Sequence, residues 1–373
     1  MIVYLRFFLI SLLLLVAAIA GFTYLINPYA VFSAGPLADV MSRKTAAADK
    51  GRSIKSYQAL VQQPEVLLVG NSRVEIGLPA QHPIYQGKVF NLGLPGAGVL
   101  MQYDYAWHVV KSTVKVKKIF LAVDFVDFLT SESAAKPLVG NWQGRLNYQL
   151  SQAHTPVTNR WVQGKEQLSF LLSQSAFIDT FLTLIQQKSD VNALSEHGFN
   201  DGRLYHHIVR TEGFAVLYQQ KQQELTDRLA NTALKVQADS TGFQALELFL
   251  QLLAEQDVEV TLFVNPYHYP YLDVIQQSGL QGEFERWKDF ISAVAQKRQL
   301  SLYDFSIASE LVMAPLQESS RDIGDNKYFW EPAHYRQAMG VLMLDAMQAG
   351  NCQVQAEGRM VEICKKLASA PLQ

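Results

Sequence analysis

The sequence has little cysteine and little net charge. Only two cysteines occur, Cys352 and Cys364, and their spacing and isolation from other ligand types exclude a metal site built on them. The 32 Lys and Arg residues nearly balance 34 acidic ones. The chain therefore has neither the basic surface of a nucleic-acid-binding protein nor an acidic solvating tail. Hydrophobic residues make up 49% of the 373 residues, which excludes a disordered protein.

The N-terminus carries a long hydrophobic run. Residues 7–26 are apolar or neutral throughout and follow Arg6, and about 20 such residues cross a bilayer as a helix. A cleaved signal peptide, with its small-residue site at 18–20, is the alternative. We favour an anchor because the run continues beyond that site. The expected location is the bacterial inner membrane, single-pass, with the main domain in the periplasm or another extracytoplasmic space, although basic residues after the span leave the opposite orientation open.

Buried-strand patterns alternate with helical patterns along the chain. Short apolar runs bounded by turn residues predict strands at 66–69, 89–92, 118–124, 258–264 and 300–305. Amphipathic spacing predicts helices at 46–62, 99–111, 241–256, 282–299 and 336–347. This alternation implies parallel pairing with right-handed crossovers. We therefore expect an α/β fold with a flavodoxin-like, three-layer parallel sheet of about five strands.

These patterns predict four parts. They are an anchor at 1–27, a juxtamembrane connector and helix at 28–63, an α/β domain at 64–350, and a C-terminal tail at 351–373. The α/β domain is interrupted at about 130–240 by a region too long for a loop, with helical patterns at 167–187 and 216–236, so we expect a helical insertion. In an exported protein the two cysteines can form a disulfide that holds the tail. Two unpaired buried thiols are the alternative.

Ser72 follows the first predicted strand, in the sequence Gly-Asn-Ser-Arg. Open α/β sheets bind their ligands at the carboxyl ends of the strands, which makes this serine a candidate nucleophile. A helix N-cap is the ordinary role of a serine after a strand, so the local sequence leaves both roles open. The neighbouring Arg73 can hold a substrate anion, or it can pair with Glu75 or Asp124.

Other parts of a serine-dependent site follow later in the chain. A serine hydroxyl needs an imidazole that takes its proton, and the imidazole needs a carboxylate that holds its tautomer. His334 and Glu331, three residues apart, can supply both. The oxyanion needs preorganised donors, for which the N–H groups of Ser72 and of Gly93, two residues after Asn91, are suited. A turn glycine and a surface histidine are the plain alternatives.

Two further pairs of polar residues are candidates for substrate binding. Asn265 and His268 follow the fourth predicted strand and should lie at the same sheet edge, as candidate substrate-binding residues. The adjacent His206 and His207 point in different directions on any regular element, which favours a solvated loop over a site. The glycine-rich turn that starts at Gly93 lacks both a phosphate-loop lysine and a dinucleotide fingerprint. No metal or organic cofactor is expected.

Together these motifs resemble the SGNH (GDSL-like) hydrolase superfamily, over roughly residues 64–347. The setting of Ser72 is similar to the first block of that family, where the serine is the nucleophile. Asn91 and Gly93 are similar to the second block, whose glycine lends an oxyanion N–H. His334, in Glu-Pro-Ala-His, is similar to the last block, usually Asp-x-x-His. More narrowly, the chain looks like membrane-anchored bacterial SGNH-like proteins that accompany surface-polymer acylation, such as alginate acetylation and teichoic acid D-alanylation.

The resemblance implies a serine acyl-ester hydrolase or O-acyltransferase. Its substrate would be an acylated glycan or cell-envelope polymer outside the cytoplasm. Ser72 would attack the acyl group, His334 would act as general base and then general acid, and Glu331 would orient the imidazole. Partners implied in this way are the inner membrane, through residues 7–26, and a membrane-bound O-acyltransferase, but no nucleic acid.

Two departures from the family pattern support a non-catalytic alternative. Asp124 stands where the third block usually has an asparagine that donates to the oxyanion. Glu331 replaces the usual aspartate, a role that Asp304 or Asp325 could also fill. The alternative is an inactive SGNH-like scaffold that binds glycan or docks on a membrane acyltransferase.

Overall fold

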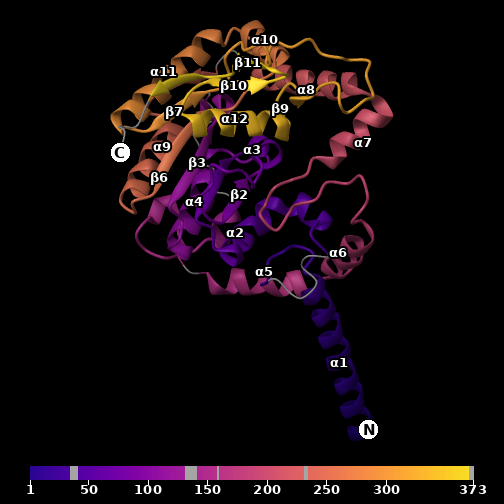
Figure 1. Cartoon of the computed structure of the whole chain (residues 1–373). Coiled ribbons are helices and arrows are strands. Elements are labelled where there is room, and N and C mark those ends of the chain that lie inside the picture. The colour runs from indigo at the N-terminus through magenta and orange to yellow at the C-terminus, as the bar shows by residue number, and fades with distance from the viewer. Residues whose placement is uncertain (34–40, 131–140, 158, 231–233, 369–373) are drawn as a thin grey trace.

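The computed structural model describes residues 1–33, 41–130, 141–157, 159–230 and 234–368. It contains an α/β domain and an apolar N-terminal helix, α1 (Ile2–Ile26), which stands away from the domain (Figure 1). α1 is long and apolar enough to cross a membrane. It begins five residues before the apolar run predicted from the sequence, so Arg6 lies within it.

Six strands form the main sheet, in the order β12-β7-β6-β3-β1-β2. Five of them pair in parallel and match the strands predicted from the sequence: β1 (Val66–Gly70), β2 (Val89–Gly93), β3 (Lys118–Val123), β6 (Glu259–Val264) and β7 (Ser301–Asp304). The sixth, β12 (Lys365–Ala368), pairs antiparallel with β7 at the edge. The predicted α/β class is therefore confirmed, with one more strand than expected.

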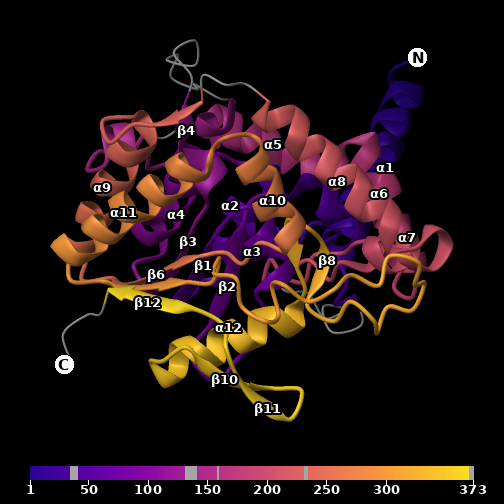
Figure 2. The same cartoon turned by 90° about the horizontal axis from the view of Figure 1, so that it is seen from above.

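Helices cover both faces of this sheet (Figure 2). Leu67 and Val69 of β1 belong to the apolar cluster on one face, whereas Val66 and Leu68 belong to the cluster on the other face. Burial on both faces explains why β1 is a continuous apolar run without polar alternation. The first face packs on α2 (Gly51–Gln62), α4 (Val99–Thr113), α9 (Thr241–Ala254) and α11 (Gln281–Lys297), and the second on α3 (Ser72–Gly77) and α12 (Gln337–Ala349).

Between β3 and α9 the chain is largely helical. The helical pattern predicted at 167–187 is divided into α5 (Arg160–Leu172) and α6 (Gln174–Ile185), because Ser173 ends the first helix and caps the second. The pattern at 216–236 corresponds to α8 (Phe214–Leu229). Short elements accompany these helices: η2 (Phe125–Phe128), β4 (Leu129–Thr130), η4 (Asn141–Arg145), η5 (Leu150–Gln152) and β5 (Lys235–Val236).

Five further elements differ from the sequence-based prediction or add to it. His206 and His207 lie on a helix, α7 (Arg203–Glu212), and not in a solvated loop, and the ring of His206 packs 5.0 Å from that of Trp330. η1 (Thr45–Lys50) precedes α2, where one helix was expected, and α10 (Tyr269–Gln277) follows β6. Residues 328–335 form a hairpin of β8 (Phe329–Glu331) and β9 (His334–Tyr335) immediately before α12.

The C-terminal segment is folded where a tail was predicted. β10 (Gln353–Ala356) and β11 (Arg359–Glu362) pair as an antiparallel hairpin, and β12 then joins the main sheet. A disulfide joins Cys352 to Cys364 across this hairpin. Of the two alternatives for the cysteines, the structure therefore has the disulfide. Together with the apolar helix α1, it is consistent with an extracytoplasmic domain.

Candidate active site

Ser72 lies at the first turn of α3, directly after β1. The connection is tight: a side chain at Gly70 would place its Cβ 2.5 Å from Val74 and 3.0 Å from Ala122. Asn71 is the N-cap of α3, and its Oδ1 accepts a hydrogen bond from the Arg73 N–H at 3.1 Å. The capping role that the sequence left open for Ser72 therefore belongs to Asn71. The serine hydroxyl remains available for other contacts.

The hydroxyl of Ser72 meets His334. Ser72 Oγ and His334 Nε2 are 2.7 Å apart, although the two residues are 262 positions apart in the sequence. On the other side of the imidazole, Nδ1 is bonded to Glu331 Oε1. The second carboxylate oxygen of Glu331 accepts the Ala333 N–H at 2.6 Å. The three residues that the sequence predicts as catalytic are thus brought together in the order Ser–His–Glu.

The β8–β9 hairpin explains the spacing of Glu331 and His334. The two residues are cross-strand partners on either side of a two-residue turn, so their side chains project from the same face. Burial by itself raises the pKa of Glu331, but the charge and hydrogen bond of His334 outweigh burial and lower it. Glu331 is therefore a carboxylate that holds Nδ1 protonated and leaves Nε2 to face the serine.

Tyr205, on α7, also reaches this histidine. Its hydroxyl lies 3.5 Å from His334 Nδ1, and its ring stacks on Trp330 at 5.3 Å. The sequence analysis missed this residue, because nothing in the polar segment around it indicates that α7 packs against the β8–β9 hairpin. The contact holds the imidazole from a second direction.

Arg73 pairs with Asp124, at the end of β3, and not with Glu75. Its Nε donates to the Ala333 carbonyl at 2.7 Å, and its guanidinium lies 4.9 Å from the ring of Tyr267. Asp124 also accepts from Asn71 Nδ2 at 3.1 Å. The structure therefore has the pairing of Arg73 with Asp124, and the contact with Ala333 ties α3 to the hairpin that carries His334. A role of Arg73 toward a substrate anion stays a prediction.

Asp127 extends this network toward the pocket. Its Oδ2 accepts from Gln102 Nε2 at 3.1 Å and lies 3.3 Å from Asn71 Nδ2. Burial and the nearby charge of Asp124 raise the pKa of Asp127 to about 7. The sequence analysis did not single out this residue, because its titration depends on burial that only the folded chain creates.

Asn91 and Gly93 lie beneath α3. Asn91 Nδ2 donates to the carbonyls of Val74 and Leu78, both at 2.8 Å, and Asn91 Oδ1 accepts the Gly93 N–H at 2.9 Å. The Gly93 N–H therefore already has a protein acceptor, which differs from its predicted availability to an oxyanion. The N–H of Ser72 belongs to the first turn of a helix, which leaves it without an intrahelical acceptor.

Ser72 and His334 open into a cavity of about 400 Å³. Lys221, Glu224 and Arg228 of α8 line its other side. Lys221 and Glu224 pair with each other at 2.6 Å, and Arg228 is exposed. The cavity is therefore bounded by polar and charged groups of both signs, opposite the serine.

The predicted binding residues after β6 lie elsewhere. Asn265 is fully buried and accepts from the Tyr335 hydroxyl at 3.3 Å. His268 lines a different hollow, where Nε2 lies 3.1 Å from the Ala314 carbonyl, and burial lowers its pKa to about 4. Neither residue lines the cavity at Ser72.

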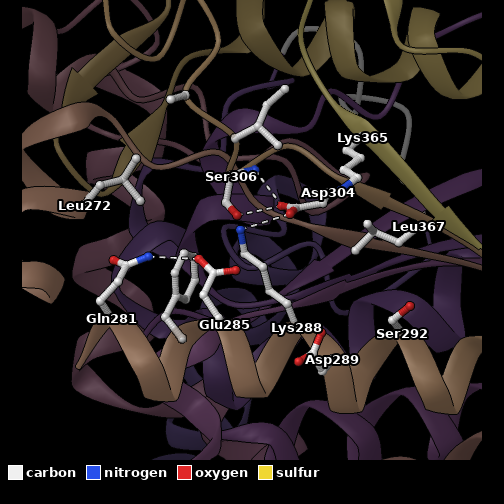
Figure 3. A pocket seen from close by; sticks show the side chains of 13 residues that line it. Leu272, Gln281, Glu285, Lys288, Asp289, Ser292, Asp304, Ser306, Lys365 and Leu367 are labelled. Atoms are coloured by element: carbon white, nitrogen blue, oxygen red, sulfur yellow. Dashed lines mark hydrogen bonds and ion pairs between the residues drawn. The ribbon is translucent and has the colours of Figure 1, made fainter.

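Asp304 is also engaged elsewhere, in a second hollow of about 470 Å³ (Figure 3). It pairs with Lys288 at 3.0 Å and accepts from the Ser306 hydroxyl at 2.6 Å. Glu331, and not Asp304, is the carboxylate on His334. Within the described ranges, no three His, Cys, Asp or Glu side chains gather as a metal ion would require.

Comparisons with known proteins add no family to this geometry. No protein-family model matches the chain, and a search of the curated proteins finds no match. The functional argument therefore depends on the arrangement of the residues themselves.

Proposed function

We propose that the chain is a membrane-anchored serine acyl-ester hydrolase or O-acyltransferase of SGNH type. The observation that carries the proposal is the 2.7 Å contact between Ser72 Oγ and His334 Nε2, with Glu331 on the opposite imidazole nitrogen. The strand order supports it as well. Without its antiparallel edge strand, the sheet runs β2-β1-β3-β6-β7, the flavodoxin-like order, and Ser72 and Asp124 follow the two strands at its switch point.

The proposed reaction is acyl transfer through the serine. Ser72 Oγ bonds to the acyl carbonyl carbon while His334 Nε2 takes the hydroxyl proton, and Glu331 stabilises the resulting imidazolium. The tetrahedral intermediate collapses, the bond to the alcohol breaks, and His334 returns the proton to the leaving oxygen. Water, or an acceptor hydroxyl, then attacks the acyl-serine with the same proton transfers in reverse order. The Ser72 N–H is the backbone donor that can reach the oxyanion.

The setting of the site supports a polar substrate outside the cytoplasm. The cavity is lined by charged residues of α8 and not by an apolar slot, which suits an acylated glycan or envelope polymer better than a long-chain lipid ester. The apolar α1 and the disulfide support a domain held on the outer face of the inner membrane. A membrane-bound O-acyltransferase is the proposed protein partner, which would donate or accept the acyl group.

A non-catalytic scaffold is the second candidate, and the oxyanion side of the site favours it. The Gly93 N–H is bonded to Asn91, and Asp124 replaces the usual asparagine donor. In such a protein the same cavity would bind a glycan, or the domain would dock on an acyltransferase, without covalent chemistry.

A fluorophosphonate probe separates the two candidates. We expect the folded, full-length protein to be labelled and Ser72→Ala to lose all labelling, because the probe reacts with a serine whose proton is removed. Ser112→Ala is the matched control. Ser112 Oγ also faces a histidine, at 3.3 Å from His108 Nδ1, but it lies on α4 and does not line the cavity. Absence of labelling in the folded wild type would favour the scaffold.

A further inference from the structure

An exposed apolar surface covers one side of α5 and α6. The two helices meet at an angle of 51°, and we call the set of exposed apolar side chains on them the α5–α6 surface: Trp161, Leu168, Leu172, Phe177, Ile178, Phe181 and Ile185. On each helix these residues recur at helical spacing and therefore share a side. Trp161 is 81% exposed and Ile185 75% exposed. A patch of this kind on a folded domain marks a contact with a partner or a membrane.

The α5–α6 surface adjoins the end of α1. α1 packs against both helices, and the ring of Phe22 lies 5.2 Å from that of Phe181. Thr180 Oγ1 lies 3.4 Å from Thr23 Oγ1. In Figure 1, α5 runs crosswise to α1 at the base of the domain, where α1 enters it. The apolar outer side of α1 and the α5–α6 surface are therefore continuous.

The depth of this contact fits an interfacial position. Residues 7–26 of α1 span about 30 Å, which is the thickness of the hydrocarbon core. Phe22 lies one turn before Ile26, so Phe181 lies about 6 Å inside the end of the apolar run. Amphipathic helices that lie in a membrane surface bury their apolar side about 5–10 Å deep.

The two acidic residues of α5 and α6 are paired with groups of the domain. Asp179 pairs with Lys50 at 2.7 Å and accepts from the Tyr29 hydroxyl at 2.5 Å. Glu166 pairs with Arg145 at 2.7 Å. The exposed Lys165, one turn from Trp161, has a side chain long enough to reach lipid phosphates.

We propose that the α5–α6 surface lies in the outer leaflet of the bilayer beside α1 and binds lipid there without crossing the membrane. Each helix, of 13 or 12 residues and about 20 Å, is too short to span by itself. The pair together is long and apolar enough, but it is bent by 51° and its acidic residues Glu166 and Asp179 are held in ion pairs with the domain. The inference rests on the proposed anchor but not on catalysis. Its consequence is a domain attached to the membrane at two places, by a helix and by a surface.

Tryptophan quenching by brominated lipids tests this proposal. The full-length protein is placed in nanodiscs whose lipids carry bromine near the headgroup end of the acyl chain. The chain has five tryptophans, and we expect Trp161 to account for most of the quenching. Trp161→Phe should therefore lose most of it. Trp330→Phe is the matched control, since Trp330 is buried against Tyr205 and should leave the quenching unchanged.

Equal quenching in the wild type and in Trp161→Phe would overturn the proposal. So would a Trp161 emission typical of water, which is the result expected if this surface serves a protein partner that the nanodisc lacks. Ser72→Ala should retain full quenching, so that the outcome does not depend on the proposed esterase activity. Failure of the chain to remain in the nanodisc would overturn the anchor and this inference together.

Discussion

Asn71 and Ser72 have different roles at the start of α3: one caps the helix and the other contacts the histidine. Asn71 caps α3 through Oδ1, and its Nδ2 contacts Asp124. The hydroxyl of Ser72 is then free to face His334. The same Asp124 neutralises Arg73, so its charge is compensated within the network and is not left unpaired beside the oxyanion. At the scale of single residues, the departure at Asp124 therefore has a structural explanation.

The raised pKa of Asp127 predicts that the stability of the folded protein depends on pH. Burial and Asp124 raise its pKa to about 7, against the opposing charges of Arg73 and Arg228 and the hydrogen bond from Gln102. The unfolded value is about 3.9. At a pH between these two pKa values, Asp127 holds a proton in the native state that it has lost in the unfolded state. The free energy of unfolding should therefore fall by up to about 1.4 kcal/mol per pH unit as the pH rises from about 4 to 7, and then level off.

Asp127→Asn should remove this decline, because an amide does not titrate. Urea unfolding of the two proteins in nanodiscs, at several values between pH 4 and 8, measures the effect. We expect the variant to gain stability relative to the wild type as the pH rises through the window. Parallel pH profiles for the two proteins would contradict the prediction.

The elements that could be predicted from the sequence are those whose pattern reflects burial on both faces. β1, β3 and β6 are continuous apolar runs because helices cover each side of them. β12 has two exposed lysines and lies at an edge, so it carries no such pattern. α7 begins at Arg203, after the N-cap residue Gly202 in the left-handed region, φ 64°, within a polar stretch that resembles a loop.

The candidate site was predictable to the same extent. Ser72, Glu331 and His334 could be named because strand ends and a two-residue turn determine their positions locally. Tyr205 could not be, because its contact with His334 depends on how α7 packs against β8. For Gly93, the sequence predicts the position of the residue at the strand end. It does not predict that the Gly93 N–H donates to Asn91 Oδ1.

β2 and α3 approach each other closely at Gly93. A Cβ at this residue would lie 2.4 Å from the backbone nitrogen and 2.8 Å from the Cα of Glu75. Gly93→Ala should therefore displace the first turn of α3 and cost about 1–3 kcal/mol of stability, as overpacking does. Because that turn carries Ser72, fluorophosphonate labelling should fall as well.

Gly98→Ala is the control for this substitution. It lies in the same glycine-rich turn, but nothing lies within 4 Å of an added Cβ. Thermal unfolding and labelling rates of both variants give the comparison. If Gly93→Ala matched Gly98→Ala in both measurements, the close approach of β2 to α3 would have no part in positioning the serine.

The molecule as a whole is assembled from segments far apart in the chain. The β8–β9 hairpin, α7 and α8 come from different regions, yet all three reach the end of β1 where Ser72 lies. The disulfide precedes the edge strand β12. Three strands of the main sheet, β7, β6 and β3, lie between β12 and β1, which leads to Ser72.

Replacement of both cysteines by serine should lower stability without removing the site. The disulfide closes a loop of 12 residues, for which about 2–4 kcal/mol is typical. We expect a lower urea midpoint for Cys352→Ser/Cys364→Ser, with fluorophosphonate labelling at Ser72 retained under native conditions. The double substitution avoids a free thiol. Loss of labelling in a folded double variant would show that β12 supports the site after all.

The separation of 262 positions between Ser72 and His334 also has a consequence for biosynthesis. At about 5–20 residues per second, a ribosome needs on the order of 10–50 s to add the histidine after the serine. Throughout that interval the growing chain lacks His334, the imidazole that faces Ser72 in the folded protein. The proposed nucleophile would therefore acquire its base only after nearly the whole chain has been made and folded.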